Sequence, residues 1–217
     1  MVADRQPGDI AAVATEAELR GNFGAVHPLA TGKVMAQIDA YAAKFIGLSP
    51  FLCIGTADAD GRADVSPRGD PPGFVLILDD RHLLIPDRPG NNRLDTMANI
   101  VANPQVGLLF FIPGIEDTVR VNGRARIVRD HELLSPATVG RKVPKAGILL
   151  EVEEVFFHCA KALKRSKLWD PAARVDRSAL PPLAKIVLDQ MNQCDTPAAE
   201  VAPIEADIQS DYKDGLY

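Results

Sequence analysis

The sequence has little cysteine and no arrangement of cysteine or histidine that is typical of a metal site. Its three cysteines, Cys53, Cys159 and Cys194, form no C-x-x-C pair, which argues against a disulfide framework and a cysteine zinc site. The four histidines are scattered, and no His and carboxylate spacing places two ligands on one helix face or tight turn. We therefore expect no metal and a reducing, cytoplasmic environment.

The chain also lacks the common catalytic signatures and the features of nucleic-acid or membrane proteins. G-x-S-x-G, H-E-x-x-H, G-x-G-x-x-G and the P-loop are all absent. A net charge of -5 does not supply the basic face that binding to nucleic acid needs. No apolar run approaches the roughly 18 residues of a membrane span, and the acidic start, from Asp4 onward, does not fit a signal peptide.

What the sequence does contain is ample apolar material in a strand-like pattern. Hydrophobic residues make up 47% of the 217 residues, enough to bury a sizeable core. Seven segments have the composition and turn boundaries of strands, at 51–58, 62–66, 74–78, 82–86, 105–112, 118–128 and 147–159. The arm 74–78 is apolar enough to lie buried on both faces. Mostly antiparallel strands with one inserted helix favour a closed or partly closed barrel, a mainly β fold with flanking helices.

Helices are predicted before, within and after the strands. Thr31 can cap a helix that runs to residue 48 and buries Val34, Ile38, Tyr41, Ala42 and Phe45. A second helix, ending before Asn103, buries Leu94, Met97, Ala98 and Val101. The acidic tail favours disorder until Ile204, Ile208, Tyr212 and Leu216, whose spacing indicates an amphipathic helix. We divide this single structural domain into an N-terminal helical segment packed on the barrel (1–50), the barrel (51–170) and a C-terminal extension (171–217).

The loop "SPRGDPPG", residues 66–73, is stiffened by three prolines around Arg68 and Asp70. One interpretation is a surface turn with an ion pair between these two side chains, worth under about 1 kcal/mol. The other is that strand pairing brings Arg68 close to Arg88 and Arg93. Three converging arginines would repel one another unless an anion lay between them.

The segment "IPDRPGNNRLDTM", residues 85–97, places Arg88, Asn91, Asn92 and Arg93 around a helix start. Exposed N–H groups, the helix dipole and guanidinium donors together make a compact anion site, for which phosphate is the natural ligand. Alternatively, one asparagine caps the helix and both arginines are solvated surface charges. Spacing alone favours this second interpretation.

Four segments, "SPRGD", "DRPGNNRLD", "TVRVNGRA" and "HCAKALKRSKLW", resemble those of the flavin-binding split-barrel proteins related to pyridoxamine 5'-phosphate oxidase, in an uncharacterised oxidase-like branch. The resemblance covers well over half of the chain. It implies a split barrel of six to seven strands and a homodimer with FMN in a cleft between the two barrels, contacted by both chains.

The resemblance also implies three groups of FMN-binding residues. Beside the flavin ring it places Ser66, Arg68, Gly69 and Asp70. Along the ribityl chain and phosphate it places Pro86, Asp87, Arg88, Asn92 and Arg93. The third group comprises Thr118, Arg120, Lys161, Arg165, Ser166 and Trp169. Of these, Thr118 and Arg120 come from the partner chain, and Thr118 stands where the family uses glutamine. The region 161–169 has another interpretation, a basic surface patch with Trp169 as a core or interface anchor.

The activity implied is that of an FMN-dependent oxidoreductase, with flavin-mediated hydride transfer to or from a small substrate and no assigned catalytic residue. The vitamin B6 oxidases carry an R-L-H-D-R type motif where this chain has "KRSKLW", so oxidation of pyridoxine phosphate is not expected. Two alternatives stay open. One is a non-catalytic flavin or heme carrier, with His158 as the histidine facing the cleft, and the other is an F420-dependent reductase on the same fold.

Overall fold

The computed structural model describes residues 10–217. The chain divides into two compact units, Met1–Val34 and Met35–Tyr217. Residues 1–9, which include the acidic start that argued against a signal peptide and the beginning of the predicted N-terminal segment, lie outside the described residues. In the first unit, the side chain of Thr15 caps α1 (Glu16–Gly21) and that of His27 caps α2 (Pro28–Gly32).

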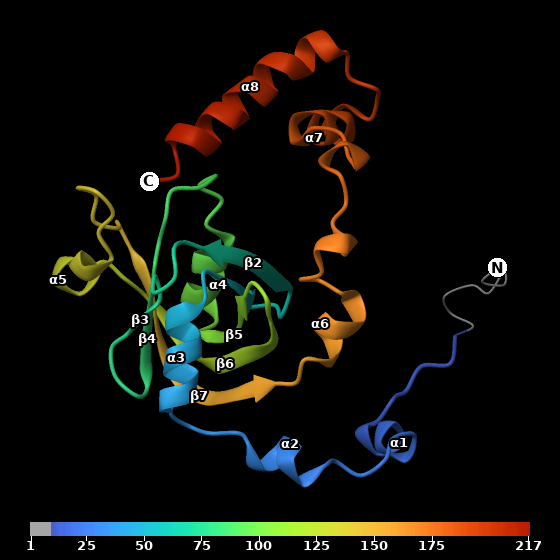
Figure 1. The fold of residues 1–217 in the computed structure, drawn as a ribbon, viewed down its shortest axis with the longest axis vertical. Helices are drawn as coiled ribbons and strands as arrows, with labels where there is room; N and C mark the ends of the chain where they lie inside the picture. The colour runs from blue at the N-terminus through green and yellow to red at the C-terminus, as the bar shows by residue number, and fades with distance from the viewer. Residues whose placement is uncertain (1–9) are drawn as a thin grey trace. The chain divides into compact units, whose positions relative to one another are not determined.

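The second unit is built on one seven-stranded sheet in which every neighbouring pair is antiparallel. The strand order is β2-β1-β5-β6-β7-β4-β3, so β2 and β3 are free edges and the curved sheet is a split barrel (Figure 1), as the sequence predicts. The strands are β1 (Phe51–Ala57), β2 (Ala63–Gly69), β3 (Leu76–Ile77), β4 (His82–Pro86), β5 (Gln105–Ile112), β6 (Ile115–Val128) and β7 (Gly147–His158).

The core lies inside the curved sheet. Alternate residues of β1, β5 and β6 point inward, so Leu52, Ile54, Phe110 and Val121 are fully buried. Burying side chains of this size contributes about 1.5 to 3 kcal/mol each. The predicted arm 74–78 is shorter than expected, because β3 is an edge strand that pairs only with β4. Ile77 at its end is 36% exposed, so that arm is not buried on both faces.

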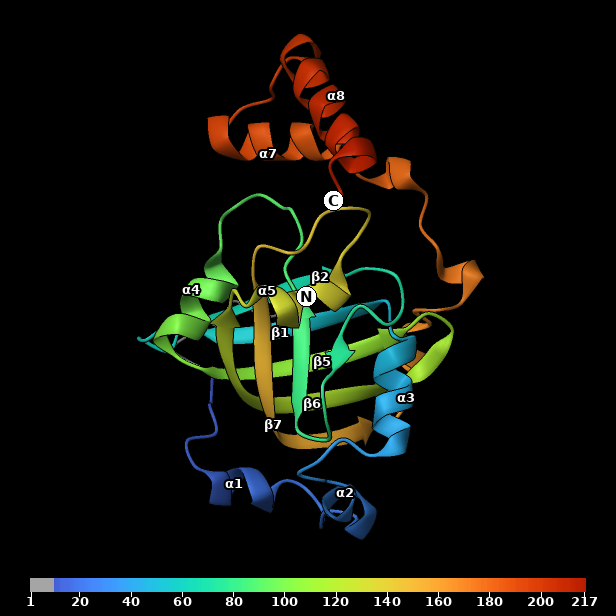
Figure 2. The ribbon, with the colours of Figure 1, turned by 90° about the vertical axis from the view of Figure 1, so that its left-hand side faces the viewer.

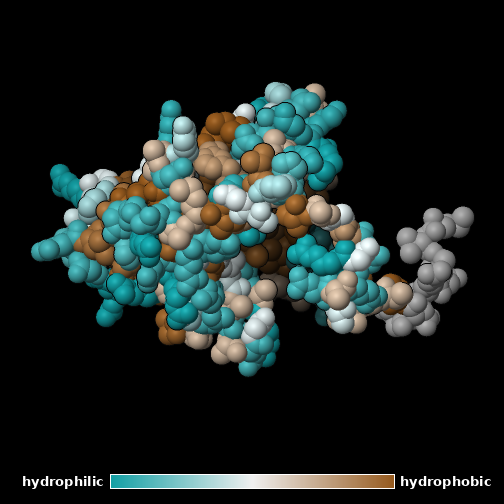
Figure 3. All heavy atoms as spheres, turned by 90° about the horizontal axis from the view of Figure 1, so that it is seen from below, coloured by the Kyte–Doolittle hydropathy of each residue, from teal (hydrophilic) through white to brown (hydrophobic). Residues whose placement is uncertain are grey.

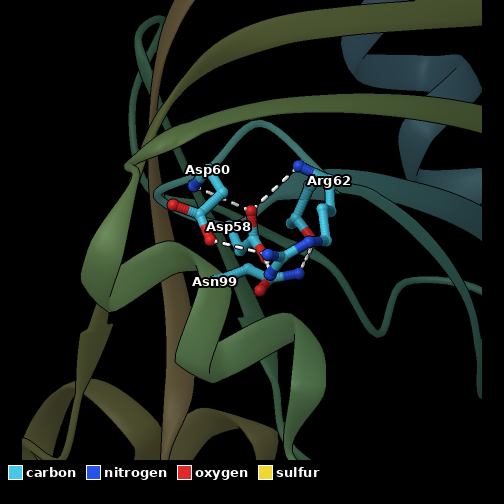
Figure 4. A network of polar contacts seen from close by, with 5 residues as sticks. Asp58, Asp60, Arg62 and Asn99 are labelled. Carbon is cyan, nitrogen blue, oxygen red and sulfur yellow. Dashed lines mark hydrogen bonds and ion pairs between the residues drawn. The ribbon is translucent and has the colours of Figure 1, made fainter.

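The turn between β1 and β2 forms at Asp60–Gly61, and the Asp58 carboxylate holds it together. Asp58 Oδ1 accepts hydrogen bonds from the backbone N–H groups of Asp60 and Arg62, each at 2.9 Å. Arg62 in turn forms ion pairs with Asp58 and Asp60 (Figure 4). These local bonds hold the hairpin that carries β2.

Two helices of the second unit lie at different ends of the barrel (Figure 2): α3 (Ala40–Leu48) and α4 (Asp95–Ala102). The predicted start of α3 at Thr31 is wrong. Asp39 is the cap, and its carboxylate accepts from Ala42 N at 2.7 Å. Met35 instead pairs with Val155 of β7, and this tertiary pairing holds the preceding segment extended. Tyr41, which was expected to be buried, is 76% exposed.

The buried face of α4 also differs from the expectation. The helix buries Thr96 and Ile100, whereas Leu94 is 54% and Val101 78% exposed. The helix begins only at Asp95, after the left-handed Leu94, so Leu94 lies outside it, and the face that is buried is the one that carries Thr96 and Ile100.

The remaining helical segments follow β6 and β7. They are α5 (His131–Leu134), α6 (Lys161–Ser166), α7 (Leu183–Asn192) and α8 (Ala198–Asp214), with short 3-10 turns at Ser135–Ala137, Pro171–Ala173 and Arg177–Ala179. A helix predicted near the end of the chain is present as α8, which packs against α7. The expected disorder before Ile204 is wrong, because α8 already begins at Ala198, and Leu216 lies beyond its end. No helix within residues 10–217 is long and apolar enough to cross a membrane.

Candidate cofactor site

Two adjoining cavities flank the segment that connects β4 to α4: the first lies between that segment and β2, and the second is lined by that segment, residues from 139 to 145 and Tyr217. The first has a volume of about 210 Å³ and the second about 450 Å³. They share Asp87, Arg88, Gly90 and Asn92 as walls. The structure brings six of the predicted cofactor-binding residues to the first cavity: Ser66, Arg68, Asp87, Arg88, Asn92 and Arg93.

Asp70 belongs to this site through an ion pair that the sequence analysis did not foresee. The suggested pair between Arg68 and Asp70 is wrong, because Asp70 Oδ2 accepts from Arg88 Nε at 2.5 Å, across 18 residues. The two side chains are 2% and 18% exposed. Arg88 Nη1 also donates to the Ala137 carbonyl at 2.9 Å, so the guanidinium is fixed on two sides.

The other oxygen of Asp70 has a partner that sequence reasoning missed entirely. The Tyr217 hydroxyl donates to Asp70 Oδ1 at 2.5 Å, and the Arg88 guanidinium lies 5.7 Å from the centre of the Tyr217 ring. No local pattern could reveal this contact, because 147 residues separate the two partners. The remaining predicted residues here, Gly69 and Pro86, end β2 and β4 and do not line the first cavity.

Carboxylates accompany the three arginines of the first cavity. Asp64, Asp87 and Asp95 line it too, and Arg93 forms an ion pair with Asp95 at 2.8 Å. The structure therefore does not require a bound anion to hold the three arginines close together, contrary to the expectation. Arg68 differs from the others, because its buried Nε has no hydrogen-bond partner among the residues described. A buried donor without an acceptor is costly.

The start of α4 faces the first cavity without a side-chain cap. Neither Asn91 nor Asn92 caps the helix, since Asn91 Oδ1 accepts from Arg93 N at 3.1 Å and the cap position is Leu94. Both Asn92 and Leu94 have a positive φ, of 56° and 62°. For leucine this conformation costs about 1 to 2 kcal/mol. The first-turn N–H groups of α4 are thus left for water or a ligand.

Burial perturbs the carboxyl of Asp87, which lines both cavities. It raises the pKa of the Asp87 carboxyl above its ordinary value of 3.8, and the positive charges of Arg68, Arg88 and Lys145 oppose this rise only in part. The charged form of Asp87 is therefore less favourable in the folded chain than in the unfolded one.

Asp87→Asn is expected to stabilise the protein more at neutral pH than at acid pH. The raised pKa means that the folded chain holds this proton more tightly, so the parent loses stability as the pH rises through the folded pKa. Asparagine cannot ionise and escapes that loss. The midpoint of thermal unfolding is measured for variant and parent at about pH 3 and about pH 7. The variant's midpoint should exceed the parent's by more at pH 7 than at pH 3. An equal difference in unfolding midpoint at both pH values would contradict a raised pKa of the Asp87 carboxyl in the folded chain.

The third predicted group lies apart from both cavities within one chain. Thr118 is buried in β6 opposite His158, and the Arg120 guanidinium lies 4.5 Å from the centre of the Phe156 ring. In the region 161–169, Trp169 Nε1 donates to the Ile115 carbonyl at 2.9 Å. Contacts of Thr118, Arg120, Lys161, Arg165, Ser166 and Trp169 with a cofactor remain predictions for an assembly of two chains. Among residues 10–217, no three His, Cys, Asp or Glu side chains group as metal ligands would.

Several solved structures are similar to this chain over little more than half of its length. HupZ from Group A Streptococcus is 21% identical, with a TM-score of 0.43, and the similarity covers 53% of this chain and 91% of that one. A putative pyridoxamine 5'-phosphate oxidase from Lactobacillus delbrueckii is 24% identical (TM-score 0.42; 56% and 99% covered). An FAD binding protein from Mycobacterium smegmatis is 18% identical (TM-score 0.39; 57% and 97% covered).

No curated protein is similar enough to this chain to count as a match. The sequence does match the family model described as Pyridoxamine 5'-phosphate oxidase over residues 38–159. This match is more than half of the 217 residues, and it spans the strands and the α4 start that form the first cavity. The protein therefore belongs to the pyridoxamine 5'-phosphate oxidase family.

Proposed function

We propose that the protein is an FMN-dependent oxidoreductase that holds the cofactor in the first cavity. The family to which it belongs includes flavin-dependent oxidoreductases. The observation that carries the proposal is the buried, unpartnered Nε of Arg68, which lines the same cavity as the uncapped start of α4. A ligand with one anionic end and acceptors along its length would satisfy both sets of donors.

The donors present fit the two ends of FMN. The N–H groups at the start of α4, with Asn92 and Arg93, are suited to the phosphate, because a helix start and a guanidinium both favour an anion. Arg68 lies on β2, across the cavity from that segment, and would accompany the flavin ring. We assign Asp87 and Arg88, which lie between these groups in the cavity wall, to the ribityl chain.

The size of the first cavity supports a cofactor shared between two chains. Its 210 Å³ is smaller than the about 300 to 1,000 Å³ of typical ligand pockets, which supports a site that a second chain completes. Val65, which lines the cavity, is 68% exposed, and Phe51 on the neighbouring strand is 38% exposed. On the side of the molecule that is seen from below, Figure 3 shows apolar residues scattered among polar ones. We propose that a second copy of the chain covers the exposed part of β1 and β2.

When bound, the flavin would supply the hydride chemistry, and the chain would supply orientation, exclusion of water and charge near the ring. The Arg68 guanidinium, close to the ring, would stabilise the negative charge that reduction adds and so raise the reduction potential. The second cavity, which adjoins the first, offers a place for a small substrate. The three cysteines are free, and Cys159 and Cys194 are exposed, which is in keeping with the proposed cytoplasmic location.

Purified protein is expected to be yellow or to take up FMN in a titration, and to sediment as a dimer. The absorbance spectrum and FMN titration test the cofactor, and analytical ultracentrifugation at micromolar concentration tests the assembly. A colourless protein that does not bind FMN would contradict the proposal. Binding of F420 or heme instead would assign the first cavity to that cofactor. A monomer that still binds FMN would exclude the shared cleft.

A further inference from the structure

The segment that follows α8 returns to the wall shared by the two cavities and is held there by three contacts. The Tyr217 hydroxyl donates to Asp70 Oδ1, its ring lies beside the Arg88 guanidinium, and its main-chain oxygen accepts from Lys142 Nζ at 2.6 Å. Tyr217 also lines the second cavity. The residue therefore meets the candidate site with its backbone, its ring and its hydroxyl.

Asp70 connects Tyr217 to Arg88. Its side chain is only 2% exposed, so both of its oxygens depend on protein donors, and each has one: Arg88 Nε on Oδ2 and the Tyr217 hydroxyl on Oδ1. The two short hydrogen bonds fix the plane of the carboxylate. That plane sets the direction from which the Arg88 guanidinium approaches.

The same contacts decide which edge of Arg88 is left for a ligand. Nε is engaged by Asp70 and Nη1 by the Ala137 carbonyl. Among residues 10–217, no residue accepts a hydrogen bond from Nη2. Arg88 lines both cavities, so Nη2 is the nitrogen that remains for a bound molecule.

We propose that Tyr217 is a positioning residue of this site, which acts through Asp70 to hold Arg88 with its Nη2 edge available to a ligand of the two cavities. The inference rests on the proposed function where the ligand is FMN, but the holding of Arg88 does not. The pKa of the Tyr217 phenol is raised, first by its hydrogen bond to Asp70, so the hydroxyl stays protonated and able to donate at neutral pH. The α7–α8 pair thereby becomes part of the binding site although it lies outside the sheet.

The packing of α8 explains how so distant a segment can position a side chain. Glu205 of α8 accepts from Ala184 N at the start of α7 at 3.2 Å, and Val201 of α8 is buried. At the other end, Gly215 N donates to Asp211 O at 2.8 Å and closes the helix just before Tyr217. The segment is thus fixed by α7 on one side and by Lys142 and Asp70 on the other.

The decisive test needs no ligand. In the FMN-free protein, Arg88 Nε–H should exchange slowly with solvent, because it is bonded to a buried carboxylate. Tyr217→Phe keeps the ring and the backbone contact but removes the donor, and should speed this exchange in ¹⁵N-resolved NMR spectra by about threefold or more. Tyr212→Phe, within α8 at a residue that is 52% exposed, is the matched control and should change nothing. Unchanged exchange in Tyr217→Phe would overturn the inference.

A second arm measures FMN binding. Tyr217→Phe should weaken FMN affinity by about three- to tenfold, the loss of part of one hydrogen bond, with no further loss when it is added to Asp70→Asn. If Tyr217→Phe lowers FMN affinity equally in the parent and in the Asp70→Asn protein, Tyr217 does not act through Asp70. Unchanged FMN affinity in Tyr217→Phe would also contradict this action. If the parent ignores FMN while Arg88 Nε–H still exchanges faster in Tyr217→Phe, the proposed cofactor fails and the positioning of Arg88 by Tyr217 stands.

Discussion

Arg88→Ala is expected to lower the free energy of unfolding by about 3 kcal/mol, because it leaves a buried charge without its partner. Asp70 is only 2% exposed, and the Tyr217 hydroxyl would be the one side-chain donor left to it among residues 10–217. The bond from Arg88 to the Ala137 carbonyl would be lost as well. Urea unfolding of the FMN-free protein measures the change, so the result does not depend on the proposed cofactor.

Two control variants make this prediction specific. The double variant Asp70→Asn, Arg88→Ala removes both charges of the pair and should recover part of the lost stability. Arg62→Ala breaks exposed ion pairs with Asp58 and Asp60, where the arginine side chain is 75% exposed, and should cost under about 1 kcal/mol. If Arg88→Ala and Arg62→Ala lower the free energy of unfolding by the same small amount, the pair between Arg88 and Asp70 contributes no more than a surface interaction.

Arg93→Ala is expected to weaken FMN binding by roughly tenfold to over a hundredfold. The variant would remove the charge-assisted bond that we propose between Arg93 and the phosphate, worth about 1.5 to 3 kcal/mol. The stability of the protein should hardly change, because the Arg93 side chain is 73% exposed and its ion pair with Asp95 lies at the surface. Isothermal titration of the FMN-free protein with FMN gives the affinity.

Arg62→Ala is also the matched control for this experiment. Arg62 and Arg93 are similarly exposed, at 75% and 73%, and each forms an ion pair with aspartate, but only Arg93 lines the first cavity. The Arg62→Ala protein should bind FMN like the parent. Equal affinities in Arg62→Ala and Arg93→Ala would remove Arg93 from the phosphate site.

The strands and hairpins could be predicted because their signals are local. Alternating apolar residues in β1 and β5, and the Asp60–Gly61 turn, specify extended segments and their nearest partners within a few residues. The helix start at residues 91–95 was visible for the same reason. Its exact phase was not, since Leu94 adopts a left-handed conformation that leucine rarely takes and that only the surrounding structure can impose.

The sequence by itself determined the antiparallel barrel, the family and the two segments, around residues 66–68 and 87–93, that line the first cavity. Only the tertiary structure decided which charges pair there. Arg68, two residues from Asp70, suggested the obvious ion pair, yet Asp70 is bonded to Arg88 and Tyr217. The physical reason is that partners of a buried carboxylate are chosen by where the folded backbone places donors and excludes water. Those donors come from residues 18 and 147 positions away, beyond the reach of any local pattern.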